Sequence, residues 1–528
     1  MRSAPLPLLL TTALAACSGS SGSSNPNPDP LDVTFQATTV APSDAPGSAG
    51  RFLPYLIREA DEGADLNGDG DQADEVVHIL DTATDTTLNL GVATTEPLVL
   101  GEDWFAYSRD EVTEGLDLNA DFDLLDQVLF AYDLASGLTR PTDLAVGEVL
   151  AIGSRAFLEV SEQENGGNDF NGNLSVTDVL FYRLDPATGD LIDTGFDFPG
   201  TSFHRRGDTV VFAGPDELYV YDLETGFDRS FDISARDLAG SGDLLAFWVS
   251  EADAAEDLND DLDQDDDVVF IYDFPTSFLR NTRIERTGDV PFAFTTDYVG
   301  FAGEFAGAQG VALVDILNVS AEFVPVVPDR LEGIGRDMIV DVDESLDLLD
   351  RNGDGDTNDI VPSYLDTTAL VQTSLGVATV GMLARGDTVL FSVPESGQGN
   401  TDLNGDGDTL DRVLHRLDVP TRTVTNLGLA GGVLGTLGDR FLLLNVSEGA
   451  ESLNADADTA DAVLHVFDLE SAEVSNLGLA VEAGEDLLEA AFAEVFPALV
   501  PESDQGAADL NGDGDTADLV LHLVEPAN

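Results

Sequence analysis

The stretch DLNGDGDTLD at residues 402–411, followed after one residue by the apolar run VLHRLD at residues 413–418, sets the pattern for most of the chain. Oxygen-bearing side chains stand at loop positions 1, 3, 5, 7 and 10. Glycine stands at position 6, where a loop that wraps around a ligand must turn back sharply. Carboxylate and amide oxygens at this spacing suit a hard cation such as Ca²⁺. The stretch therefore predicts a calcium-binding loop that leads into a β-strand.

The same pattern occurs eight times, which excludes a chance match. The candidate metal ligands at positions 1, 3, 5, 7 and 10 of the eight loops are Asp65, Asn67, Asp69, Asp71, Asp74, Asp117, Asn119, Asp121, Asp123, Asp126, Asp169, Asn171, Asn173, Ser175, Asp178, Asp257, Asn259, Asp261, Asp263, Asp266, Asp350, Asn352, Asp354, Asp356, Asp359, Asp402, Asn404, Asp406, Asp408, Asp411, Ser452, Asn454, Asp456, Asp458, Asp461, Asp509, Asn511, Asp513, Asp515 and Asp518. The third loop has only two carboxylates among these positions, so we expect it to bind calcium most weakly.

The first half of the pattern, D-x-[DN]-x-D-G as at residues 402–407, resembles the calcium loops of EF-hand, dockerin and integrin-type proteins. The second half departs from the EF-hand, because an apolar residue such as Val76, Val413 or Val520 replaces the glutamate at position 12 and the closing carboxylate stands at position 10. This departure favours a loop between two strands over one between two helices. The resemblance also implies that position 7 ligates through its backbone carbonyl, so positions 1, 3, 5 and 10 are the firmer candidates.

A glutamate precedes every one of these loops. We interpret it as a candidate additional ligand or as a residue that supports the ligands, although glutamate at the entry to a hairpin could also serve solubility alone. Two repeat units have no loop, and there the position holds Gly214, or Glu304 in an altered Phe-Ala-Gly context. The eight glutamates are Glu59, Glu111, Glu162, Glu251, Glu344, Glu395, Glu448 and Glu502.

Composition limits the partners. The chain has 528 residues, 43% of them hydrophobic, and a formal charge of −79 from 101 acidic and 22 basic residues. Nucleic acid and anionic lipid are therefore poor electrostatic partners, whereas cations are good ones. Eight Ca²⁺ ions would leave a net charge of about −63, so part of the acidity must serve a solvated surface.

The N-terminus predicts secretion and lipid anchoring. Residues 1–16 have the composition of a signal peptide, and the sequence LAAC at residues 14–17 resembles the bacterial lipobox, in which the cysteine is lipidated. Cys17 is the only cysteine in the sequence, which excludes an intrachain disulfide. Residues 17–30 have the composition of a flexible tether. These features, with Ser18 after the cysteine, predict a cell-envelope lipoprotein of the outer membrane or cell surface.

Residues 31–528 repeat a pattern of short strands. An acidic residue ends one strand of each unit, and it recurs ten times, with mostly 50–57 residues between copies and shorter spacings in the two units without a loop. Four short antiparallel strands per unit predict an all-β fold, a β-propeller of about ten four-stranded repeats. Two smaller propellers are the alternative. The Tyr-Asp-Leu-x-x-Gly sequences at residues 132–137 and 221–226 resemble a turn of TolB-like propellers.

The last unit ends after its third strand. We expect the N-terminal segment at residues 31–37 to supply the missing fourth strand, because pairing the two ends of the chain closes the ring and removes its free edges.

No catalytic residue is predicted. His78, His415, His465 and His522 occupy one repeat position that aromatic residues fill elsewhere, which favours packing over catalysis. His204 lies outside this pattern, beside Arg205 and Arg206, and no nucleophile motif accompanies it.

Two functions stay open. One is a lipid-anchored, calcium-binding envelope protein that binds a protein or glycan. The other is an extracellular polysaccharide hydrolase or lyase with its site in the propeller channel.

Overall fold

The structure is a computed structural model. It describes residues 33–38, 41–42, 50–94, 97–197, 200, 202–214, 216–305, 307–316, 320–449, 451–482, 491–492, 495–512 and 514–526. The predicted signal peptide, Cys17 and the tether lie outside these residues, as does Asp513. Within the described residues, no helix is long and apolar enough to cross a membrane.

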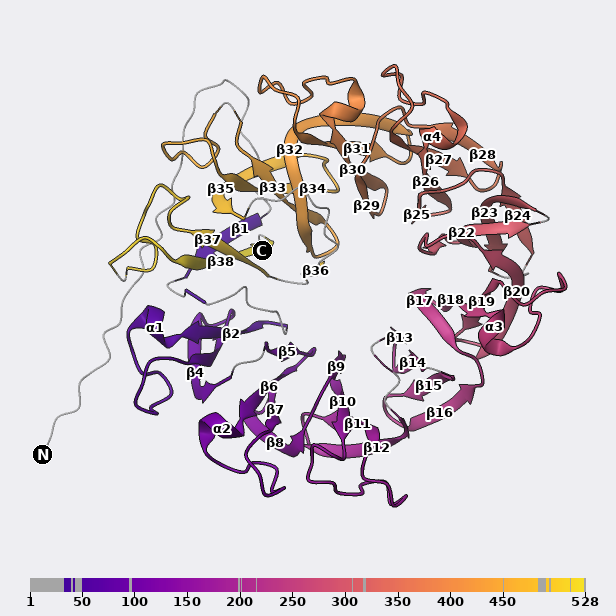
Figure 1. The fold of residues 1–528 in the computed structure, drawn as a ribbon. Helices are drawn as coiled ribbons and strands as arrows, with labels where there is room; N and C mark the ends of the chain where they lie inside the picture. The colour runs from indigo at the N-terminus through magenta and orange to yellow at the C-terminus, as the bar shows by residue number, and fades with distance from the viewer. Residues whose placement is uncertain are drawn as a thin grey trace, which may run out of the picture.

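The described chain is nearly all β. Its strands pair antiparallel in consecutive groups of up to four, and Figure 1 shows these groups following one another around a central opening. In two places neighbouring groups are joined into one eight-stranded sheet. This arrangement is that of a β-propeller.

The strands of the first half of the ring, group by group, are β2 (Phe52–Arg58), β3 (Glu75–Asp81) and β4 (Thr86–Ala93); β5 (Val99–Leu100), β6 (Trp104–Asp110), β7 (Gln127–Asp133) and β8 (Leu138–Ala145); β9 (Val149–Ile152), β10 (Arg155–Ser161), β11 (Val179–Asp185) and β12 (Asp190–Asp197); β13 (Phe203–Arg206), β14 (Thr209–Ala213), β15 (Leu218–Asp222) and β16 (Gly226–Phe231); β17 (Ala235–Ser241), β18 (Leu244–Ser250), β19 (Asp267–Asp273) and β20 (Phe278–Arg286).

The strands of the second half are β21 (Ala293–Phe294), β22 (Tyr298–Phe305), β23 (Ala308–Asp315) and β24 (Ala321–Val324); β25 (Arg330–Ile334), β26 (Asp337–Asp343), β27 (Ile360–Asp366) and β28 (Val371–Ser374); β29 (Gly381–Arg385), β30 (Thr388–Pro394), β31 (Arg412–Asp418) and β32 (Thr423–Leu437); β33 (Phe441–Ser447), β34 (Ala462–Asp468) and β35 (Val474–Val481); β37 (Phe496–Pro501), β38 (Leu519–Pro526) and β1 (Val33–Ala37). The short strand β36 (Ala491–Phe492) pairs with β32, and this pair is parallel.

The two ends of the described chain meet in one sheet. Strand β1 pairs antiparallel with β38, with Val33 opposite Pro526 and Ala37 opposite His522. The predicted closure by the N-terminal segment is confirmed. Because β38 is paired on both sides, it is not an edge strand, and β1 takes the outer position of this sheet.

The core lies between neighbouring groups of strands. Phe157 and Phe181 of one group pack against Phe212 of the next, with ring centroids 5.2 and 5.3 Å from Phe212. All three rings are fully buried. Each sheet therefore buries both faces against its neighbours, so its inner strands are apolar on both sides.

The acidic residue that ends one strand of each unit closes a tight turn. Asp222, for example, accepts hydrogen bonds from the backbone N–H groups of Glu224 and Thr225, at 3.1 and 2.7 Å. Such turns join the third and fourth strands of a group. The spacing between these acidic residues is therefore the distance along the chain between equivalent turns of successive groups.

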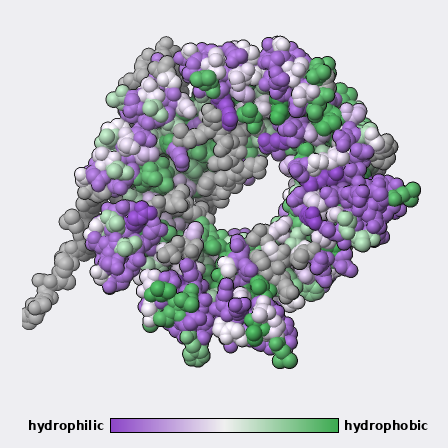
Figure 2. All heavy atoms as spheres, in the orientation of Figure 1, coloured by the Kyte–Doolittle hydropathy of each residue, from purple (hydrophilic) through white to green (hydrophobic). Residues whose placement is uncertain are grey.

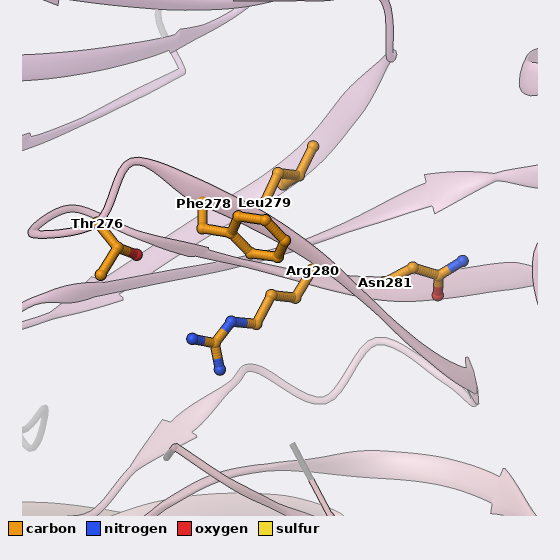
Figure 3. A pocket seen from close by; sticks show the side chains of 5 residues that line it. All are labelled: Thr276, Phe278, Leu279, Arg280 and Asn281. Atoms are coloured by element: carbon orange, nitrogen blue, oxygen red, sulfur yellow. The ribbon is translucent and has the colours of Figure 1, made fainter. Parts of the chain in front are cut away.

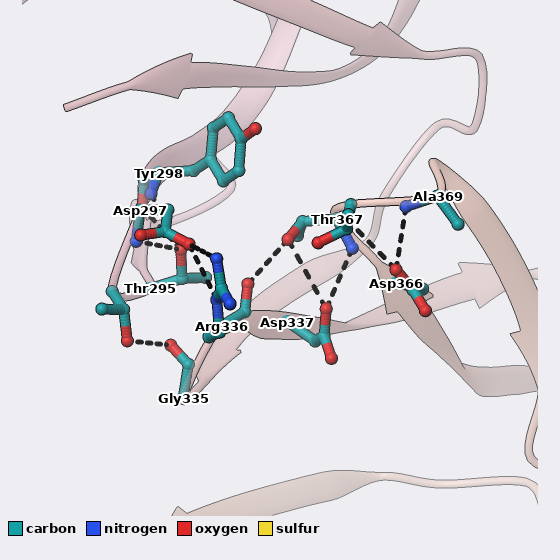
Figure 4. Close-up of polar contacts among 11 residues, drawn as sticks. Thr295, Asp297, Tyr298, Gly335, Arg336, Asp337, Asp366, Thr367 and Ala369 are labelled. Carbon is teal, nitrogen blue, oxygen red and sulfur yellow. Dashed lines mark hydrogen bonds and ion pairs between the residues drawn. The ribbon is translucent and has the colours of Figure 1, made fainter. Parts of the chain in front are cut away.

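Figure 4 shows how polar contacts join two neighbouring groups. Arg336, in the turn between β25 and β26, donates two hydrogen bonds to Asp297, which precedes β22, at 2.7 and 2.9 Å. Thr367 donates to the Arg336 carbonyl at 2.7 Å. This junction involves the β21–β24 group, which has no acidic loop, so packing between groups does not depend on the loops.

Candidate metal sites

Each acidic loop connects two consecutive strands at the outer rim of the ring (Figure 1). These are the second and third strands of a four-stranded group, and β2 with β3, β33 with β34, or β37 with β38 in the groups without a separate first strand. In four groups the preceding glutamate begins a one-turn helix that the sequence analysis did not predict: α1 (Glu59–Glu62), α2 (Glu111–Glu114), α3 (Glu251–Ala254) and α4 (Glu344–Asp347). In the β29–β32 group a 3₁₀ turn, Glu395–Gln398, replaces it. The glutamate is fixed by the strand before it, and the loop then folds over its carboxylate.

These glutamates are buried under their loops. Glu59, Glu111, Glu162, Glu251, Glu344, Glu395 and Glu502 are 0% exposed, and Glu448 is half-buried. The Glu59 carboxylate accepts hydrogen bonds from the backbone N–H groups of Leu66, Asn67 and Asp74, at 2.6, 3.2 and 3.3 Å. A buried carboxylate needs such donors to offset its lost hydration. The glutamate therefore holds both ends of the loop.

The aspartate at position 1 shapes the first half of the loop. The Asp402 carboxylate accepts hydrogen bonds from the N–H groups of Gly405 and Gly407, at 2.6 and 3.2 Å. Gly407, at position 6, has φ 107°. That conformation strains any residue with a Cβ atom, which explains the glycine at this position.

The remaining acidic positions converge on one point. In several loops, one oxygen of each carboxylate at positions 5, 7 and 10 lies within 4.8 Å of the others, in most cases together with the buried glutamate. Such groups include Glu111 with Asp121, Asp123 and Asp126; Glu251 with Asp261, Asp263 and Asp266; Glu448 with Asp456, Asp458 and Asp461; Glu59 with Asp71 and Asp74; and Asp354 with Asp356 and Asp359. These clusters could hold a metal ion. The position 1 aspartates lie outside these five groups.

A buried oxygen without a partner points to a cation. Within the described residues, one carboxylate oxygen of Glu162, Glu344 and Glu448 is buried and has no hydrogen-bond partner. A buried carboxylate oxygen without a donor is unfavourable by roughly 1–3 kcal/mol or more. A bound cation would satisfy it, so the donor set fits a hard metal ion.

Electrostatics support the same conclusion. Burial, followed by the neighbouring carboxylates, raises the pKa of Asp126, Asp411 and Asp461, all at position 10, to about 6. In the third loop, hydrogen bonds from Asn173 and Ser175 instead lower the pKa of Asp178. Carboxylates crowded without a counterion resist ionisation, and a divalent cation relieves that penalty.

Asparagines complete each site. The position 3 side chain lies in the cluster, where Asn67 donates to the Asp74 carboxylate at 2.8 Å. Another asparagine, on the fourth strand, was missed by the sequence analysis. Asn89, Asn426 and Asn476 donate to the carbonyl of loop position 2, at 2.8–3.0 Å. Each stands in an Asn-Leu-Gly sequence, a repeated signal that could have revealed it.

Some loops also contact the next group along the chain. Asn352 donates to the Gly397 carbonyl at 2.8 Å, and the Gly399 N–H donates to Asp354 at 3.1 Å. Asn454 likewise donates to the Asp504 carbonyl at 2.8 Å. In these pairs a candidate ligand of one loop touches the turn that carries the glutamate of the next, so neighbouring sites share contacts.

The histidines are used in packing. His78, His415, His465 and His522 are 4–5% exposed, and burial lowers the pKa of each. His204 packs against Phe274, while Arg205 pairs with Glu102 and Arg206 with Asp243. Packing and ion pairs therefore account for His204, Arg205 and Arg206, the three residues that depart from the repeat pattern.

A shallow pocket of about 640 Å³ lies beside β20 (Figure 3). Its lining is Thr276, Phe278, Leu279, Arg280 and Asn281. Arg280 pairs with Asp273 at 3.6 Å, and Asn281 donates to the Leu258 carbonyl at 2.8 Å. Its polar groups therefore serve the fold, and Asn281 holds the loop at residues 257–266.

No known protein family and no curated protein sequence matches the chain. Similar solved structures are β-propeller proteins. The β-propeller domain of the Trilobed protease from Pyrococcus furiosus is 9% identical, covers 63% of this chain and 97% of that chain, and has a TM-score of 0.27. Porphyromonas gingivalis dipeptidyl peptidase 4 is 11% identical, with 71% and 58% coverage and a TM-score of 0.38.

Proposed function

We propose that this protein is a calcium-binding β-propeller of ten four-stranded units that acts as a binding protein on the cell envelope. Eight of the units carry a calcium loop. The observation that carries the proposal is the recurrence of one site design: a glutamate, fully buried in seven of the eight cases, under a loop in which the carboxylates at positions 7 and 10, and in most of the clusters position 5, converge. Oxygen-only donors in flexible loops suit Ca²⁺ better than a metal that prefers nitrogen or sulfur.

A binding role fits the molecule better than catalysis. The acidic clusters repeat with little variation, whereas an active site requires one or two units with a distinct set of groups. His204, Arg205 and Arg206 do differ, but their side chains are held by packing and ion pairs. The calcium sites are therefore structural, and the ligand is bound by the surface that they hold in place.

Calorimetric titration with CaCl₂ tests the sites directly. We expect at least four ions per chain at millimolar calcium. Binding should release protons at pH 6, on the order of half a proton at each site whose position 10 aspartate has a pKa of about 6, and almost none at pH 8. The comparison of two buffers with different ionisation enthalpies measures this release. Fewer than four ions would mean that most of the loops are acidic turns, and calcium uptake without proton release at pH 6 would contradict the site assignment.

We also propose that a lipid at Cys17 anchors the protein to the membrane. An acylated terminus with several chains is sufficient for stable anchoring. Cys17→Ala should leave the protein unprocessed or release it in soluble form, as measured by cell fractionation and radiolabelled palmitate. Ser18→Ala is the matched control and should stay lipidated. Lipid-labelled, membrane-bound Cys17→Ala protein would overturn the proposal.

A further inference from the structure

Three acidic loops carry a large apolar residue where the others carry a small one. Position 6 is Phe122, Leu174 and Leu262 in these loops, and it is glycine in four others. The three residues have φ of 80°, 73° and 86°, and they are 96%, 93% and 92% exposed. A side chain in this conformation is unfavourable by about 1–2 kcal/mol relative to an ordinary backbone. These side chains therefore strain the backbone and bury almost no apolar surface, so they do not stabilise the fold.

Two of these residues stand on neighbouring loops. We call the exposed apolar residues Phe122, Leu125, Leu174 and Val176 of these two loops the loop-tip patch. Leu125 is 79% and Val176 42% exposed. The two loops are joined through the turn at residues 166–167. A Cβ atom on Gly166 would lie 2.9 Å from the Cβ of Asp121, and one on Gly167 would lie 3.9 Å from the Cβ of Val176.

Figure 2 shows apolar surface at the outward tips of the two loops, in the lower part of the ring. Scattered apolar residues on a surface need no explanation, but apolar side chains grouped on neighbouring loops mark an interaction site. The backbone strain at position 6 points the same way, since strained residues persist where function requires them.

The residues around the patch are strongly acidic, and their charge favours a positively charged partner. Residues 110–126 and 161–178, which include both loops, contain eleven acidic residues and no lysine or arginine. The nearest arginine along the chain, Arg109, already pairs with Glu114 at 2.7 Å. Two bound Ca²⁺ ions would supply four positive charges, so the surface stays strongly negative. A partner must therefore bring both apolar groups and positive charge.

We infer that the loop-tip patch binds a polypeptide segment in which aliphatic side chains alternate with lysine or arginine. The inference rests on the proposed function, because the calcium sites hold both loops in place. It also narrows that function to a protein ligand. Three of the four patch residues are aliphatic and offer sugar hydroxyls no hydrogen-bond partner, and an anionic lipid headgroup is repelled by the acidic surroundings.

Substitution by glycine separates binding from folding. Phe122→Gly with Leu174→Gly introduces the residue found at position 6 of four other loops, so the variant should keep its calcium stoichiometry and its melting temperature. Leu262→Gly is the matched control, because this loop lies between the β13–β16 and β21–β24 groups, which have no acidic loop. The probe is a fluorescein-labelled synthetic peptide of alternating leucine and lysine, followed by anisotropy in millimolar CaCl₂.

We expect the double variant to bind this peptide at least tenfold more weakly than the unchanged protein, and Leu262→Gly to bind it as before. A serine–lysine peptide should bind weakly and equally to all three, because it lacks the apolar groups. If the double variant and the unchanged protein bind the leucine–lysine peptide equally well, with calcium still bound, the patch is not the peptide site. That result would overturn this inference and leave the proposed calcium-binding function standing. The inference would also be overturned if the unchanged protein bound phosphatidylglycerol vesicles and not the peptide, and the double variant lost this vesicle binding. A chain that binds no calcium would instead refute the proposed function.

Discussion

Removal of calcium should lower the melting temperature of this protein by on the order of 10–20 °C. A ligand that binds only the folded state stabilises it by about 2.7 kcal/mol per site at a hundredfold excess over the dissociation constant. If all eight proposed sites bind calcium, they act together on a chain of 528 residues, for which about 1 kcal/mol shifts the transition by roughly one degree. In chelator, the carboxylates of each cluster also repel one another at short range.

Differential scanning calorimetry in millimolar CaCl₂ and in EGTA measures this shift, and circular dichroism follows the strands. The β content should persist in EGTA at 25 °C, because the core between groups consists of apolar side chains, as at Phe157, Phe181 and Phe212. The double variant Asp408→Asn and Asp411→Asn should bind one calcium ion fewer. Its melting temperature should therefore differ less between calcium and EGTA than that of the unchanged protein. Asp228, which is half-exposed and pairs with its neighbour Arg229 at 2.7 Å, provides the control substitution Asp228→Asn. An identical melting temperature with and without calcium would refute the structural role of the ion.

Glu111→Ala should destabilise its unit by about 3 kcal/mol or more. The Glu111 carboxylate is 0% exposed and accepts hydrogen bonds from the N–H groups of Leu118, Asn119 and Asp126. Alanine would leave three donors unpaired, each unfavourable by roughly 1–3 kcal/mol when buried, although water entering the loop reduces the sum. The loop at residues 117–126 should become the first site of protease cleavage.

The matched control for this substitution lies in the same one-turn helix. Glu114 pairs with Arg109 and is 25% exposed, so Glu114→Ala should change stability by less than about 1 kcal/mol. Limited proteolysis with and without EGTA separates the two roles of Glu111. If Glu111 holds the loop, Glu111→Ala speeds cleavage even in EGTA. If it acts only as a metal ligand, the variant and the unchanged protein are cleaved equally in EGTA.

The order of the repeat could be predicted from the sequence because its signals are local. Alternating apolar residues indicate strands, and the acidic residue at a strand end indicates a turn such as that of Asp222. The closure of the ring by residues 31–37 followed from counting strands in the last unit. The co-occurrence of a glutamate with every loop was also visible, and it suggested a ligand or supporting role. The hydrogen bonds that the glutamate accepts from the loop backbone were not visible.

What the sequence determined by itself is therefore the character of each short segment: a loop of ten residues with oxygen donors, and a strand on either side. Hydrogen bonds between residues two to five positions apart, such as Asp402 to Gly405, are set within such a segment. Tertiary structure decided which donors converge. The glutamate enters from the preceding strand, the asparagine from the fourth strand, and Gly397 and Gly399 from the next group. These contacts span 7–45 residues, and no local pattern places their atoms, because their distances depend on how whole sheets pack around the ring.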